Sequence, residues 1–527
     1  MKNIFLVTIS LFFISGKVFS QTDISLHYAE TITREGLNHQ LTVIASEEME
    51  GRETGTQGQR KAATYIETQF KKIGLLPPPL LGGYRQEYLI QKDTIMPKIF
   101  KIDKKKYNFG IDYIITRGTK DENEFKANDI IFAGYGIADK NYDDYAGKNI
   151  KGKVVLIFHG EPKNNGKYLV SGTSGHSIWG LSINEKILAA EQKGAVAIFI
   201  INPSNNILLT TAVENSEKSN SNLVQQKNNS NKNIPVISIV PAVVKNIIGN
   251  KETAEITDAA KAGRPLKNTF IEKRIKLKLA YGNEKILAEA SNIIGYIEGS
   301  DKKDEFVFLT SHYDHLGKHD GEIYYGADDD GSGTASVIEM AEAFVKAKKD
   351  GHGPKRSIVF MTVSGEEKGL LGSQYYAEHP VFPLASTTAD LNIDMIGRVA
   401  DGRNYDDSAN YIYIIGDDKL SSDIKPITRE VNEKYTKLVL DHQFDDPDEP
   451  DRIFYRSDHY NFAKKGVPII FYFDGINKDY HKPSDTVDKI NFGLMKKRVR
   501  YIFLTAWEIA NRDKILKRDL RLPEGIK

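Results

Sequence analysis

After about residue 285, short apolar runs alternate with helical patterns of hydrophobic positions. Uninterrupted apolar runs predict buried strands; they lie at residues 305–310, 357–363, 411–415 and 467–473. Apolar positions at helical spacing predict a helix over residues 334–348. This alternation predicts an α/β fold with a mixed, largely parallel sheet and helices on both faces. In such sheets, functional residues gather just beyond the carboxyl ends of the strands.

The middle of the chain has a different pattern. Short runs typical of strands occur there, with one amphipathic helix expected over residues 183–192; the runs are 129–133, 153–158, 195–201 and 234–240. A tract rich in Asn, Ser and Lys, residues 214–232, predicts a loop. We interpret 115–272 as a β-rich inserted domain that divides a larger domain into residues 21–114 and 273–527.

The first residues resemble an export signal. Lys2 is followed by a mostly apolar run from Ile4 to Ile14, and small or modest residues precede a cleavage point after Ser20. This pattern predicts a cleavable signal peptide over residues 1–20 and a secreted or periplasmic protein. The run is too short to span about 30 Å of hydrocarbon comfortably, so we favour cleavage over a membrane anchor.

Composition narrows the possible chemistry. The 527 residues include 72 Lys and Arg, 71 Asp and Glu, and no cysteine. A near-neutral balance argues against nucleic acid as the main partner. The absence of cysteine excludes disulfides, thiolate metal sites and cysteine nucleophiles. A metal site would therefore have to consist of His and carboxylate residues.

Five segments carry such residues just after expected strands or in loops. They contain His312 with Asp314, the triplet Asp328–Asp330, the pair Glu366–Glu367, Asp394 and His481. Taken alone, the triplet and the pair also fit helix N-termini, and the two His segments also fit ordinary loops. Asp394, between Ile393 and Met395, is harder to explain as a solvated residue, because an apolar setting penalises an unpaired carboxylate.

Together, the five segments supply two His and three acidic ligands, with one Glu to spare. This set suits two Zn²⁺ ions about 3.5–4 Å apart with a bridging carboxylate, although Mn or Co would also accept these ligands. A spare Glu beside the ions suits a general base.

The order of the motifs then resembles one family. H-x-D, D-D-G-S-G, E-E-x-G-L-L-G-S, N-x-D-M-I-G-R and D-Y-H-x-P-S-D-T are similar to the M28 zinc aminopeptidases. Residues 51–56, Gly-Arg-Glu-Thr-Gly-Thr, resemble that family's leading segment. Residues 115–272 resemble the protease-associated (PA) domain often inserted in these enzymes. The resemblance implies a zinc-dependent exopeptidase fold and peptide substrates with a free N-terminus.

The resemblance also implies a role for each motif residue. His312 and Asp394 would bind one zinc ion, Glu367 and His481 the other, and Asp329 would bridge them. Glu366 would be the general base that activates a water between the ions. Asp314 would hold His312 from behind, and Tyr480 would be a transition-state donor. The segment 455–460 would support the pocket without binding metal.

Several alternatives remain open. A glutamate carboxypeptidase or a glutaminyl cyclase could use the same fold, and a receptor-like protein could use a peptidase scaffold. The absence of G-x-S-x-G and of H-E-x-x-H disfavours a serine hydrolase and a zincin. The acidic loop 441–451 is interpreted as solvated in preference to an amine-binding role.

Overall fold

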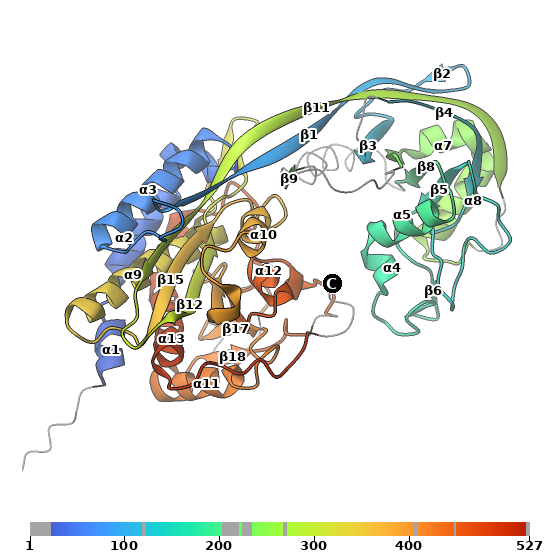
Figure 1. Cartoon of the computed structure of the whole chain (residues 1–527). Helices are drawn as coiled ribbons and strands as arrows, with labels where there is room; N and C mark the ends of the chain where they lie inside the picture. The colour runs from blue at the N-terminus through green and yellow to red at the C-terminus, as the bar shows by residue number, and fades with distance from the viewer. Residues whose placement is uncertain are drawn as a thin grey trace, which may run out of the picture.

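The computed structural model shows two lobes that share one curled, mixed sheet (Figure 1). The structure describes residues 23–117, 123–202, 221–223, 234–266, 271–403, 409–446 and 449–522. The expected signal peptide lies outside the described residues, as does most of the tract 214–232. Among the described helices, none combines the length and apolarity needed to cross a bilayer.

The sheet of the first lobe is largely parallel. Its order is β18-β17-β19-β16-β12-β15-β11, and these strands cover Val439–Asp441, Tyr411–Ile415, Ile469–Phe473, Thr387–Ile393, Lys302–His312, Arg356–Val363 and Glu272–Ile297. The four strands β19, β16, β12 and β15 run parallel, whereas β11 is antiparallel to β15 and β17 is antiparallel to β19. The carboxyl ends of the four parallel strands therefore meet at one edge.

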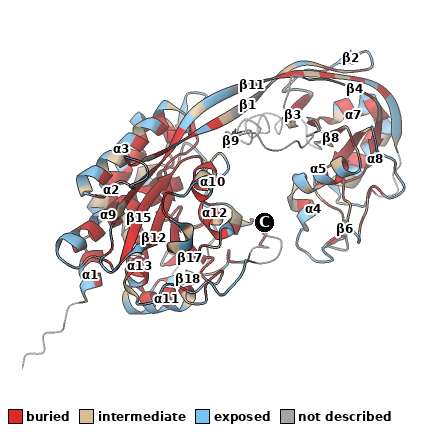
Figure 2. Ribbon diagram, in the orientation of Figure 1, coloured by how far each residue is buried: buried red, intermediate tan, exposed pale blue. Residues whose placement is uncertain are grey.

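Helices cover both faces of this sheet (Figure 2). Alternate residues of β15 face opposite ways: Ile358 and Phe360 join one apolar cluster, and Val359 and Met361 join the other. The first cluster packs beneath α1 (Ile24–Ala29), α2 (Arg34–Ile44), α3 (Gln57–Ile73), α9 (Gly333–Lys349), α11 (Ile424–Val431) and α13 (Phe492–Asn511). The second packs beneath α10 (Leu371–Glu378) and α12 (His459–Lys464). The expected α/β fold is confirmed.

Two long strands carry the chain to the second lobe. β1 (Arg85–Ile102) runs out and β11 returns, and they pair antiparallel from Arg85↔Ile293 to Ile102↔Leu277. Figure 1 shows this ribbon arching between the lobes. The sequence reading did not anticipate it, because 18 and 26 residues are unusually long for strands.

The second lobe continues the same sheet beyond β11 in the order β4-β5-β8-β10-β3. These strands cover Asn123–Phe132, Val154–Phe158, Ala197–Ile201, Val236–Ile239 and Tyr113–Arg117, and all but β3 run parallel. On one face lies α5 (Ile183–Gln192), the helix expected from the sequence; on the other lie α7 (Pro241–Ile248) and α8 (Asn250–Lys261), which were not expected. Its apolar clusters draw on residues between Phe100 and Tyr281.

Short elements complete the described fold. They are β2 (Lys105–Lys106), β6 (Lys163–Asn164), β7 (Lys167–Tyr168), α4 (Ile178–Leu181), β9 (Ser221–Leu223), β13 (Gly317–His319) and β14 (Glu322–Tyr324). The short helical turns are Glu47–Arg52 (η1), Ala327–Ser332 (η2), Leu384–Ser386 (η3), Asn432–Thr436 (η4), Ile453–Tyr455 (η5) and Val487–Lys489 (η6).

Candidate metal centre

The segments that carry the candidate ligands follow neighbouring parallel strands. His312 is the last residue of β12, Asp394 comes directly after β16, and Glu366–Glu367 lie in the loop after β15. Asp329 belongs to the turn η2 that leads into α9, and His481 lies in the loop after β19. The sheet order therefore gathers residues that are up to 169 positions apart in the chain.

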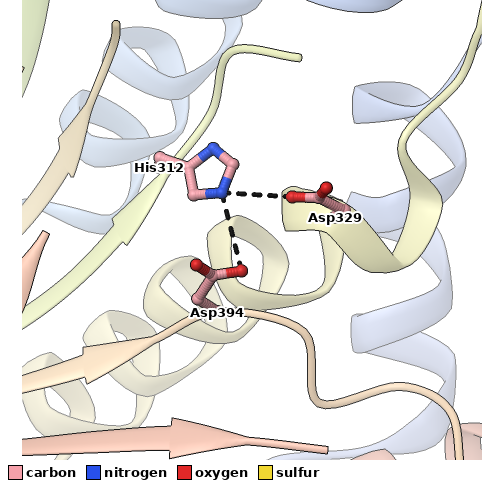
Figure 3. Close-up of side chains that lie close together, drawn as sticks. All are labelled: His312, Asp329 and Asp394. Atoms are coloured by element: carbon pink, nitrogen blue, oxygen red, sulfur yellow. Dashed lines mark ion pairs between the residues drawn. The ribbon is translucent and has the colours of Figure 1, made fainter. Parts of the chain in front are cut away.

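One half of the cluster is centred on His312 (Figure 3). Its Nε2 lies 3.2 Å from Asp329 Oδ1 and 3.6 Å from Asp394 Oδ1. Glu366 Oε2 lies 4.0 Å from the same nitrogen. His312 Nε2 is buried and has no hydrogen-bond partner among the residues that the structure describes. This arrangement suits a metal ion between them.

The other half is centred on the second oxygen of Asp329. His481 Nε2 lies 3.0 Å from Asp329 Oδ2 and 3.3 Å from Glu367 Oε1. Asp329 Oδ2 and Glu367 Oε1 are buried and accept no hydrogen bond from the described part of the chain. The carboxylate of Asp329 therefore presents one oxygen to each half, which is the placement required of a bridging ligand.

The acidic triplet separates into different roles. Asp328 Oδ1 accepts the N–H of Gly397 at 2.8 Å. Asp330 accepts the backbone N–H groups of Gly333 and Met395 at 2.8 and 3.1 Å. Both flanking carboxylates thus hold neighbouring loops together, and Asp329 is the member of the triplet that faces the histidines.

Residues behind the ligands fix their orientation. His312 Nδ1 lies 3.1 Å from the backbone carbonyl of Asp314 and 3.7 Å from its carboxylate, so the carbonyl is the nearer partner. The Asp314 carboxylate instead accepts the Thr54 hydroxyl at 2.6 Å and the N–H of Glu366 at 3.3 Å. Ser457 donates to Asp394 Oδ2 at 2.7 Å. Outer contacts of this kind orient metal ligands.

The segment at residues 51–56 also reaches the site. Arg52 is fully buried and donates to the backbone carbonyls of Tyr313, Tyr325 and Gly326 at 2.7–2.9 Å, and to that of Ile44 at 2.8 Å. These bonds connect the segment after β12 to the turn that carries Asp329. Arg52 therefore holds two ligand-bearing loops in one geometry.

The electrostatics reflect crowded carboxylates in a buried site. Burial raises the pKa of Glu366 well above its usual range, and the charges of Glu367 and Asp394 raise it further. Burial opposes protonation of His481, yet Glu367 and Asp329 raise its pKa to about 10. The same balance raises the pKa of His312. The crowded carboxylates thus favour positive charge at this site.

Tyr480 lies beside this cluster. Its ring stacks on that of His481 with centroids 3.8 Å apart, and its hydroxyl accepts from Arg456 Nη2 at 3.1 Å. Burial raises the pKa of Tyr480 above its usual range, and Asp329 and Glu367 raise it further. Tyr480 therefore keeps its proton and can act as a hydrogen-bond donor.

The sequence reading did not assign His315 to the site. His315 is fully buried, its two ring nitrogens form no hydrogen bond, and Nδ1 lies 3.0 Å from Glu367 Oε1 and 3.8 Å from Asp329 Oδ2. It is thus a further candidate ligand on the side of His481. The available signal was its place three residues after His312 in the same segment.

The structure groups His312, Asp329 and Asp394, and also His315, Asp329 and Glu367, with one ligand atom of each residue within 4.8 Å of the others in its group. Residues 292–506 match the model described as peptidase family M28. The resemblance expected from the motifs is thereby confirmed.

Two relatives show how far the sequence similarity extends. Over 340 residues the chain is 24% identical to "Aminopeptidase YwaD" of Bacillus subtilis, covering 63% of this chain and 66% of that protein. Over 119 residues it is 37% identical to "Probable glutamate carboxypeptidase LAMP1" of Arabidopsis thaliana, covering 22% of this chain and 16% of that protein. The matches thus span less than two thirds of these relatives' own lengths.

A solved structure shares the fold. The zinc aminopeptidase BSAP from Bacillus subtilis superposes with a TM-score of 0.54 at 19% identity, covering 93% of this chain and 99% of that one. The similarity therefore extends over both lobes.

Proposed function

We propose that the chain is a two-zinc aminopeptidase that removes residues from the N-termini of peptides. The observation that carries this proposal is the carboxylate of Asp329. It faces His312 with one oxygen and His481 with the other, at 3.2 and 3.0 Å, so two cations would share it. Buried ligand atoms without hydrogen-bond partners on both sides fit this interpretation.

The ligands divide between two positions. His312 and Asp394 would hold one zinc ion, Glu367 and His481 the other, and Asp329 both; His315 lies within reach of the second. When bound, zinc polarises a carbonyl group and makes a neighbouring water more acidic. Without thiolates, these ligands also accept Mn or Co.

Glu366 is the residue proposed to move the proton. It lies next to the ligand Glu367, its side chain is 13% exposed, and its Oε2 lies 4.0 Å from His312 Nε2. Glu366 would take a proton from the attacking water and pass it to the leaving amine. The hydroxyl of Tyr480, held by Arg456, would donate to the oxygen of the scissile carbonyl as negative charge develops on it.

Two observations favour an aminopeptidase over its alternatives. The longest match reported above is to a protein named as an aminopeptidase, whereas the glutamate carboxypeptidase match covers 22% of the chain. A receptor-like protein on this scaffold would have no need of a complete ligand set, and all five expected ligands lie in the cluster.

A Glu366→Gln variant tests the proposal. We expect hydrolysis of leucine and other aminoacyl anilides to fall by at least about 10³-fold while zinc content stays at two equivalents in the described cluster. Glu378→Gln is the matched control, because Glu378 lies at the exposed end of α10. Wild-type protein without aminoacyl hydrolysis after zinc loading would refute the activity, and full activity in Glu366→Gln would refute the base.

The proposal includes export and the nature of the second lobe. A cleavable signal peptide over residues 1–20 would deliver the protein to the periplasm or the medium, and residues 115–272 would form a protease-associated domain. The first is supported by Lys2 and the apolar run that follows it. N-terminal sequencing of protein exported from the cell should begin at Gln21.

A further inference from the structure

A second cluster of metal-ligand residues lies on the first lobe, away from the proposed catalytic centre. Asp417 follows β17, His442 follows β18, and Asp445 lies three residues further on. One ligand atom from each lies within 4.8 Å of the others. Because β17 runs antiparallel to β19, its carboxyl end lies at the sheet edge opposite the catalytic cluster. The two clusters therefore do not share residues or a rim.

We propose that Asp417, His442 and Asp445 bind one divalent transition-metal cation at a site separate from the catalytic centre. His442 Nδ1 lies 3.6 Å from Asp417 Oδ1 and 3.8 Å from Asp445 Oδ2. Both distances are too long for hydrogen bonds. Two ligands bound at about 2.0–2.2 Å to one tetrahedral ion lie about 3.3–3.6 Å apart, which is close to this spacing.

In Asp417 and in Asp445, one carboxylate oxygen is held by protein contacts and the other faces His442. Asp417 is fully buried; its Oδ2 accepts the Thr428 hydroxyl at 2.8 Å, whereas its Oδ1 accepts no hydrogen bond from any residue that the structure describes. Asp445 Oδ1 accepts the N–H of Gly416 at 2.6 Å and lies 3.4 Å from Lys419 Nζ, and its Oδ2 faces His442. Protein contacts thus hold the outer oxygens and leave the inner ones directed at the imidazole.

The spacing repeats that of the catalytic cluster in the same molecule. There, His312 Nε2 lies 3.2 and 3.6 Å from two carboxylates. Here, His442 Nδ1 is likewise buried and without a hydrogen bond, although its side chain is 29% exposed.

Charge near the site is compatible with a cation. Lys419 and Lys425 both form ion pairs with Asp418. Lys419 Nζ lies 3.4 Å from Asp445 Oδ1, whereas the oxygen of Asp445 nearer to His442 is Oδ2. An imidazole with two carboxylates suits Zn²⁺ or Mn²⁺ more than Ca²⁺, which prefers oxygen ligands alone. The ion would join the ends of β17 and β18 to the segment that leads towards Ser457.

Metal counting on the full chain tests this site. The wild type, Asp417→Asn, His442→Ala and the control Asp418→Asn are stripped with chelator, reloaded with Zn²⁺ or Mn²⁺, and passed through gel filtration. Metal per chain is then measured by mass spectrometry, and the melting temperature is measured with and without each metal. We expect the wild type and Asp418→Asn to retain one equivalent more than the other two variants.

We also expect at least a tenfold weaker affinity for that equivalent in Asp417→Asn and His442→Ala, with unchanged peptidase kinetics at saturating catalytic metal. Equal metal content and equal metal-induced melting shifts in all four proteins would overturn the proposal. His442 is partly exposed, so His442→Ala alone decides the matter if Asp417→Asn does not fold. Absence of peptidase activity would refute the proposed function without changing this comparison.

Discussion

Replacing Arg52 by Met should destabilise the first lobe far more than a typical substitution. Arg52 is fully buried and donates four hydrogen bonds to backbone carbonyls. Met has similar length but no donor, so these carbonyls would lose their partner. The guanidinium is also the positive charge beside Asp329, Asp314, Asp485 and Asp330.

The expected loss follows from these contacts. Hydrogen bonds from a charged donor contribute about 1.5–3 kcal/mol each, so four would give about 6 kcal/mol at the low end. Burial, which lowers the pKa of Arg52 to about 10, means that the guanidinium gives up hydration on folding and offsets part of this gain. We therefore expect Arg52→Met to lose about 3–5 kcal/mol in the free energy of unfolding.

Urea unfolding followed by tryptophan fluorescence measures this loss. The chain has two tryptophans; Trp179 lies in the second lobe and Trp507 in α13, so a Trp179→Phe background reports the first lobe. The control Arg60→Met removes an exposed arginine of α3 and should change stability by less than about 0.5 kcal/mol. A loss below 1 kcal/mol in Arg52→Met, at an unchanged denaturant slope, would refute the reasoning.

Three further predictions test other contacts. Ser457→Ala removes the donor to Asp394 Oδ2 and should weaken zinc binding about 10-fold in a chelator competition; unchanged affinity would contradict it. Tyr480→Phe should lower kcat about 10²-fold or more while KM changes less than threefold, and a rate within twofold of wild type would remove Tyr480 from the mechanism. Burial, with the charge of Glu342, raises the pKa of Glu339 to about 7, so its carboxyl favours the folded state below pH about 4.5, and this contribution is lost as pH rises through about 7. When the pH is raised from 5 to 8, the free energy of unfolding of Glu339→Gln should therefore increase by about 2 kcal/mol relative to that of the wild type, as measured by urea unfolding. Parallel pH profiles of the two proteins would contradict that assignment.

The sequence predicted the first lobe well because its strands are buried on both faces. Such strands appear as uninterrupted apolar runs, and the expected strand 411–415 coincides with β17. The second lobe was harder to predict. From Ile234 to Ile248 the chain is almost continuously apolar, so periodicity could not separate β10 from α7, which begins at Pro241. The helix was therefore missed.

The candidate site was likewise only partly predictable from the sequence. Motif order brought five candidate ligands to attention: four of them lie at or after the end of a parallel strand, and Asp329 lies in the turn before α9. His315 acquires its meaning from Glu367 and Asp329, which reach it from other loops. Arg52 likewise contacts main-chain carbonyls, and no residue type in the sequence marks a carbonyl as a partner. Such contacts depend on backbone geometry, which residue patterns do not specify.

The paired strands β1 and β11 make the second lobe a detachable unit. Ile90 lies opposite Ala288, and Gln91 opposite Leu287, so the chain departs from the first lobe and rejoins it at neighbouring points. A two-residue turn joining the strands there would keep their register without stretching the backbone. Loss or gain of the whole second lobe therefore requires no rearrangement of the loops that carry the candidate ligands, and related proteins could differ by an entire lobe while retaining the same His and carboxylate cluster.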